Sequence, residues 1–97
     1  MKLTLTVVRD EDADAVVDAL ISDGFSVTRL PSTGGFLRAG NTLILVGLED
    51  DQLEPMMEIV QSHTRLRVQP PTSRVPEETE VSRAVVFVLG LEELRKL

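Results

Sequence analysis

The order in which apolar periodicities change along this chain is the feature that most restricts its fold. Residues 2–8 alternate apolar side chains with threonines, as a strand with two different faces does. Apolar residues with helical spacing follow at 13–21 and recur at 53–60. Three further stretches have strand-like composition: 25–30, 42–48 and 81–89. The chain therefore reads strand, helix, strand, strand, helix, strand.

This order predicts one α+β domain across residues 1–97, with a ferredoxin-like βαββαβ architecture. Two helices would cover one face of a four-stranded antiparallel sheet. In the stretch 42–48 both the odd-numbered and the even-numbered residues are largely apolar. The sheet face away from the helices should therefore also be apolar. An exposed apolar face indicates a partner, and a second copy of the chain is the expected one.

Local signals predict where the elements begin and end. Acidic residues 10–12 would cap the first helix, and Gly24 would end it in the left-handed conformation. Asp51 with Glu54 matches a capping box for the second helix. The polar, proline-containing stretch 64–80 predicts a long loop before the last strand, and residues 92–97 a short terminal helix.

Composition excludes several classes of function. The net charge is −6 and there are three phenylalanines but no tyrosine or tryptophan, so nucleic-acid binding is disfavoured. The chain has no cysteine, no apolar run long enough to span a membrane and no signal-peptide pattern, which favours the cytoplasm. A lone histidine, His63, is typical of a helix cap, and the acidic runs at helix starts are typical of caps rather than of a metal site.

The glycine-rich segment 32–42, S-T-G-G-F-L-R-A-G-N-T, is the candidate for binding. It is a near miss to the P-loop of nucleoside triphosphatases, but Asn41 stands where the lysine is needed and a strand follows instead of a helix. A plain hairpin loop is the alternative. Against it, the loop is longer than a simple hairpin needs, and Phe36 and Leu37 are apolar at its tip. Adjacent glycine amides can bind an anion, and the Asn41 side chain can hydrogen-bond a purine edge.

The run T-G-G-F-L-R-A-G-N-T at 33–42, preceded by V-T-R-L at 27–30, resembles the signature of the P-II-like cyclic di-AMP receptor family. The opening M-K-L and the late A-V-V-F-V-L are also similar to it. The resemblance implies a homotrimer with the nucleotide in clefts between subunits, and a receiver of signals, not an enzyme. It implies no cofactor, and a downstream partner protein that the sequence does not identify.

The resemblance also implies roles for individual residues. Thr28 and Asn41 would contact adenine, and Gly47 would border the cleft from the adjacent subunit. Residues Gly34, Gly35, Phe36 and Leu37 would line the pocket, with backbone amides toward phosphate.

Two departures from the family pattern keep alternatives open. Family members often have arginine where this chain has Ser26, so Arg29 or Arg38 would have to supply that charge. Strand alternation, however, places Arg29 on the face of the strand opposite to that of Thr28. The loop 64–80 is also shorter than in the family and lacks glycine and tyrosine. The alternatives are a trimer that binds another adenine nucleotide, and a structural or interaction trimer without a ligand.

Overall fold

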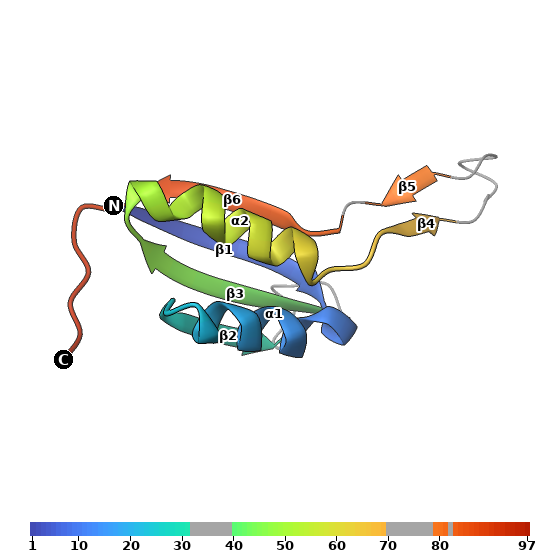
Figure 1. The fold of residues 1–97 in the computed structure, drawn as a ribbon, viewed down its shortest axis with the longest axis horizontal. Coiled ribbons are helices and arrows are strands. Elements are labelled where there is room, and N and C mark those ends of the chain that lie inside the picture. Colours follow the sequence, from blue (N-terminus) through green and yellow to red (C-terminus); the bar gives the residue numbers. More distant parts are fainter. Residues whose placement is uncertain (32–39, 70–78, 82) are drawn as a thin grey trace.

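The structure is a computed structural model that describes residues 1–31, 40–69, 79–81 and 83–97. Its helices and strands follow the expected order, with a short 3-10 turn and two small strands added (Figure 1). The elements are β1 (Lys2–Arg9), α1 (Asp10–Ser22), β2 (Val27–Pro31), β3 (Asn41–Leu48), η1 (Asp50–Gln52), α2 (Leu53–Ser62), β4 (Arg67–Gln69), β5 (Thr79–Val81) and β6 (Val85–Gly90).

The main sheet has four antiparallel strands in the order β2-β3-β1-β6. The two central strands, β1 and β3, pair along their whole length, from Lys2 opposite Leu48 to Arg9 opposite Asn41. Both helices lie on the same face of this sheet (Figure 1). The α+β ferredoxin-like fold predicted from the sequence is therefore confirmed.

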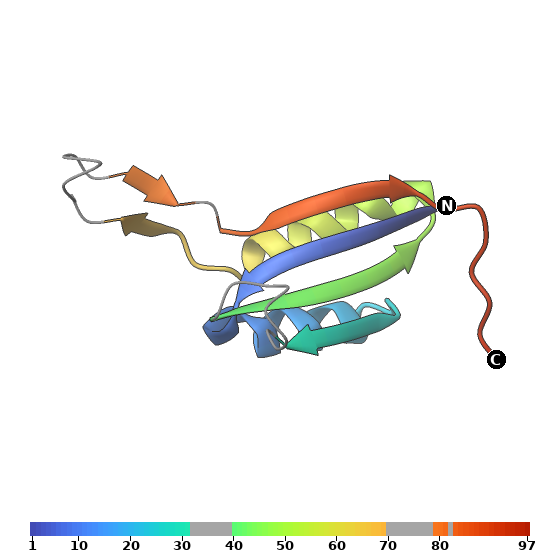
Figure 2. The same cartoon turned by 180° about the vertical axis from the view of Figure 1, so that it is seen from behind.

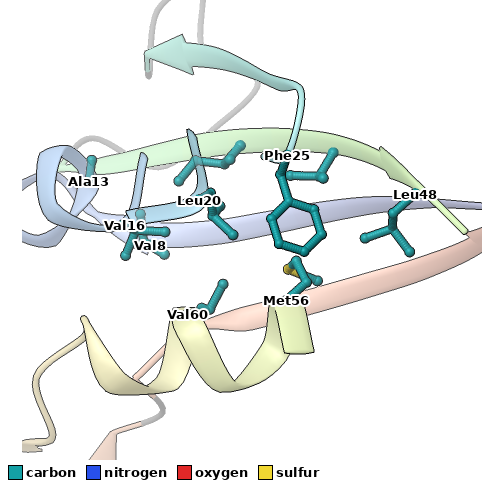
Figure 3. Close-up of a cluster of buried hydrophobic side chains, with 10 residues drawn as sticks. Val8, Ala13, Val16, Leu20, Phe25, Leu48, Met56 and Val60 are labelled. Atoms are coloured by element: carbon teal, nitrogen blue, oxygen red, sulfur yellow. The ribbon is translucent and has the colours of Figure 1, made fainter. Parts of the chain in front are cut away.

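The core lies between this face and the two helices. Alternate residues of β3 are buried, and α1 and α2 each place an apolar stripe against them. Figure 3 shows these side chains converging from both helices and the sheet. Full burial of a valine, leucine, isoleucine, phenylalanine or methionine side chain contributes about 1.5–3 kcal/mol of transfer free energy. The buried cluster consists of Val8, Ala13, Val16, Leu20, Phe25, Ile44, Val46, Leu48, Met56 and Val60.

The polarity of β1 is unusual, because its threonines face the core. Thr4 and Thr6 are fully buried beneath the helices, whereas Leu3, Leu5 and Val7 lie on the face that no helix covers. The Thr4 hydroxyl donates a hydrogen bond to the carbonyl of Val46 at 3.2 Å. The buried Thr6 hydroxyl has no hydrogen-bond partner among the described residues, which costs free energy. The more apolar face of β1 is thus the uncovered one.

The ends of α1 match the sequence prediction only in part. Gly24 has φ +91° and its N–H donates to the carbonyl of Ile21 at 3.0 Å, so the predicted left-handed end is confirmed. The predicted acidic cap is wrong: the N-cap residue is Arg9 and makes no side-chain cap hydrogen bond. The acidic residues lie one position later, within the first turn, where their charges still favour the helix dipole.

The start of α2 also differs from the prediction. The capping box joins Glu49 and Gln52, not Asp51 and Glu54, because the chain first makes the 3-10 turn η1. Glu49 thus lies in the N-cap position of that turn. At the other end, His63 is the C-cap of α2 and its Nδ1 donates to the carbonyl of Ile59 at 2.8 Å. The prediction for His63 is confirmed.

Two predictions for the C-terminal third are wrong. The stretch 64–80 is not a loop throughout, because β4 and β5 pair as a small antiparallel ladder from Arg67 opposite Val81 to Gln69 opposite Thr79. This hairpin projects from one end of the main sheet (Figures 1 and 2). Residues 92–97 form no helix. They lie at the opposite end of the molecule from the hairpin (Figure 2).

Candidate functional site

Figure 2 views the molecule from the side of the sheet that neither helix covers; we call this side the open face. The strand registers align its residues in rows across the sheet. One row runs Thr28, Leu45, Leu5, Phe87 from edge to edge. Phe87 is 56% exposed. The apolar residues of the open face are Leu3, Leu5, Val7, Leu30, Leu43, Leu45, Val85, Phe87 and Leu89.

Thr28 and Arg29 lie on opposite faces of β2. Thr28 is paired with Leu45 and belongs to the open face, while Arg29 is paired with the buried Ile44 on the helix side. The Arg29 guanidinium forms an ion pair with Asp14 of α1. Alternation along the strand predicted that Arg29 and Thr28 lie on opposite faces, and the structure confirms it. Arg29 is therefore not part of the open face.

Asn41 begins β3 and is held by a local network. It lies opposite Arg9 and shares the parity of Leu43 and Leu45, so it belongs to the open face. The preceding Gly40 has φ +88°, and its carbonyl accepts a hydrogen bond from the N–H of Asp10 at 2.9 Å. The following Thr42 donates its hydroxyl to the Asp10 carboxylate at 2.6 Å. Asp10 at the start of α1 thus contacts the residue on each side of Asn41.

Gly47 lies near the other end of β3, also on the open face. It lines a pocket of about 160 Å³ together with Met1, Ser26, Leu48, Glu49, Gln52, Leu94 and Lys96. A Cβ added to Gly47 would approach the Cδ1 of Leu94 to 2.5 Å. A side chain at this position would therefore displace Leu94.

The predicted site residues are thus divided between two ends of one strand. Asn41 and Gly47 are six positions apart, which is roughly 20 Å along a strand. The remaining predicted residues, Gly34, Gly35, Phe36, Leu37 and Arg38, lie outside the described residues. Their assignment to the site stays a prediction. One adenine base is much shorter than this distance, so it cannot contact both ends of β3 in the same chain.

The acidic side chains near these residues have structural partners. Asp12 is buried, accepts the backbone N–H of Arg65 at 3.3 Å and lies 3.9 Å from that guanidinium. The N-terminal ammonium donates a hydrogen bond to Asp50 at 3.0 Å and lowers the pKa of that carboxyl below its usual range. In the part of the chain that the structure describes, no three acidic or histidine side chains gather as a metal site would require.

A family model described as "Cyclic-di-AMP receptor" matches residues 1–97, the whole chain. The chain belongs to the cyclic di-AMP receptor family. This family is P-II-like, so the resemblance found in the glycine-rich segment is confirmed.

A solved structure supports the receptor fold independently. It is the crystal structure of a functionally unknown protein from Pediococcus pentosaceus ATCC 25745, with 31% sequence identity. The match covers 99% of this receptor chain and 96% of the other, with a TM-score of 0.75.

Among the described residues, no helix combines the length and apolar character that a membrane crossing requires.

Sequence reasoning missed two basic residues that lie beside predicted site residues or their strand neighbours. Arg9 is directly opposite Asn41, and extending the alternation of residues 2–8 by one position would have found it. Lys96 reaches Ser26, with its Nζ 2.9 Å from the serine hydroxyl oxygen. The two are 70 positions apart, and no motif or spacing in the sequence connects them.

Proposed function

We propose that this receptor is a homotrimer that binds cyclic di-AMP in the clefts between neighbouring subunits and transmits the signal through rearranged loops. The single observation that carries the proposal is the open face. It joins the predicted adenine-contacting residues Thr28 and Asn41 to an exposed apolar surface, in a chain whose family is the cyclic di-AMP receptors.

The apolar content of the open face supports self-assembly. Val85, Phe87 and Leu89 are 47%, 56% and 47% exposed in the single chain. Leu5 and Leu45 lie beside them in the central strands. Burying such a surface against another copy is favourable by about 25 cal/mol per Å² of apolar area. In a cyclic trimer each interface joins one surface of a subunit to a different surface of the next.

A cyclic trimer would account for the distance between Asn41 and Gly47 within one chain. In a cyclic trimer, Asn41 of one subunit and Gly47 of its neighbour border the same cleft. Asn41 presents an amide that can both donate to and accept from an adenine edge. Thr28 offers a hydroxyl on the same face. The amides of Gly34 and Gly35 would bind phosphate oxygens.

Signalling would follow from ordering the loops around the nucleotide. The glycine-rich segment 32–39 directly precedes Gly40, which α1 already holds. We propose that the ligand fixes this segment and that the partner protein reads the changed surface. We place this receiver in the cytoplasm, without cofactor or metal and without catalytic activity of its own.

The proposal is tested by calorimetric titration with cyclic di-AMP, ATP, ADP and AMP. Cyclic di-AMP should bind most tightly, with close to one molecule per chain because a trimer has as many clefts as subunits. Tighter binding of ATP, ADP or AMP would assign the site to another adenine nucleotide. Absence of heat with all four at ligand concentrations well above micromolar would indicate a trimer without a nucleotide.

A further inference from the structure

The segment after β6, residues 91–97, crosses the end of the sheet; we call it the tail segment. Three contacts attach it to other strands. The N–H of Leu91 donates to the carbonyl of Met1 at 3.1 Å. Leu94 lies directly over Gly47 of β3. The ammonium of Lys96 donates to the hydroxyl of Ser26, just before β2, at 2.9 Å. The tail segment thus passes from β6, beyond the start of β1, to β3 and the start of β2.

These contacts place the tail segment beside the proposed cleft. Val27 is paired with Val46, so Ser26 and Gly47 are the next neighbours across the two strands. Both line the pocket of about 160 Å³, and Leu94 and Lys96 line it too. Thr28 lies two residues beyond Ser26 on the same face of β2. The Lys96 ammonium is therefore close to a residue predicted to contact the nucleotide.

The charge of Lys96 is not neutralised within the chain. Its contact is with a neutral hydroxyl, and no carboxylate lies within ion-pair distance of it in the described part of the structure. Arg29, Arg65 and Arg95 each have an acidic partner. The acidic residue of the pocket lining, Glu49, is engaged in the capping box of η1 and makes no ion pair with Lys96, so in a chain of net charge −6 this cation favours an anion in the pocket.

We propose that the tail segment completes the nucleotide site and that Lys96 binds a phosphate group of the ligand. This inference rests on the proposed function. Leu94, seated over Gly47, sets the position of the tail segment, and the Ser26 hydroxyl orients the ammonium. The phosphate displaces or shares the Ser26 contact and gains a charge-assisted hydrogen bond. The positive charge that would face the phosphate thus comes from a segment that is far in sequence from the glycine-rich segment 32–42.

The test compares two charge removals within the tail segment. Lys96→Gln keeps a hydrogen-bond donor for Ser26 but loses the charge, whereas Arg95→Gln removes an equal charge that Glu93 already pairs. Lys96→Gln should weaken binding of cyclic di-AMP about tenfold, Arg95→Gln should change it less than about twofold, and Lys96→Arg should retain it. Calorimetry at two salt concentrations adds a readout of charge: the salt dependence should be smaller in Lys96→Gln alone.

Each result decides the inference. If the unmodified chain binds and Lys96→Gln binds equally well with the same salt dependence, Lys96 does not contact phosphate, while the proposed function stands. Equal weakening by Lys96→Gln and Arg95→Gln would show a general charge effect and also overturn it. If the unmodified chain fails to bind cyclic di-AMP, the proposed function fails and this inference fails with it.

Discussion

Replacing Asn41 with alanine is expected to lower the affinity for cyclic di-AMP about 100-fold or more without unfolding the protein. The side-chain amide is the group proposed to donate to and accept from the adenine edge. A site built for two hydrogen bonds loses several kcal/mol when one partner disappears, because the other groups remain desolvated without a partner. The backbone of Asn41 keeps its pairing with Arg9, and the Asp10 contacts on either side do not involve its side chain.

Two further variants make the Asn41 measurement specific. Asn41→Asp keeps the shape but replaces the donor with an acceptor, so it should bind nearly as poorly as Asn41→Ala. Gln61→Ala removes an exposed amide from α2, on the other side of the sheet, and should bind normally. Calorimetry measures all three. Normal binding by Asn41→Ala would mean that the adenine edge is recognised elsewhere.

Replacing Phe87 with aspartate is expected to convert the trimer into folded monomers. Phe87 is 56% exposed in the single chain and lies in the row with Leu5 and Leu45. Burying a carboxylate at an apolar interface costs several kcal/mol, more than the loss of the ring alone. The single chain should still fold, because Phe87 is absent from the core cluster.

Ile21→Asp is the matched control for Phe87→Asp. Ile21 is also 56% exposed but lies on α1, away from the open face. An aspartate near the end of α1 opposes the helix dipole by less than about 1 kcal/mol, so assembly should be unaffected. Light scattering gives the mass and circular dichroism the folded state. A trimeric mass for Phe87→Asp would show that the open face is not the interface.

The sequence was sufficient for the order of the elements because each has a periodic apolar pattern of its own. It could not tell which face of β1 the helices cover. Leu3 and Leu5 alternate with Thr4 and Thr6, and only the packing of α1 and α2 decides that the threonines are inside. The same packing puts both Asn41 and Gly47 on the uncovered face of β3, whereas their separation along the strand could be read from the sequence.

Other features depended on contacts between distant residues. The cap before α2 was misplaced because η1 precedes that helix, so that Glu49 takes the position expected for Asp51. Leucines at 91, 94 and 97 have helical spacing, yet the segment forms no helix and places Leu94 over Gly47. The small ladder of β4 and β5 forms despite the prolines between them. Local sequence preferences do not reveal these contacts, because they join residues that are far apart in the chain.

A mixed-subunit titration tests most directly the claim that the nucleotide binds between chains. Asn41→Ala and Gly47→Val each damage a different side of the proposed cleft, and valine suits the strand conformation of Gly47. Each variant alone should bind cyclic di-AMP poorly. Trimers refolded from an equal mixture should recover roughly a quarter of the sites, because that fraction of clefts combines intact Asn41 with intact Gly47. Mixed trimers that recover no binding would contradict a site shared between subunits.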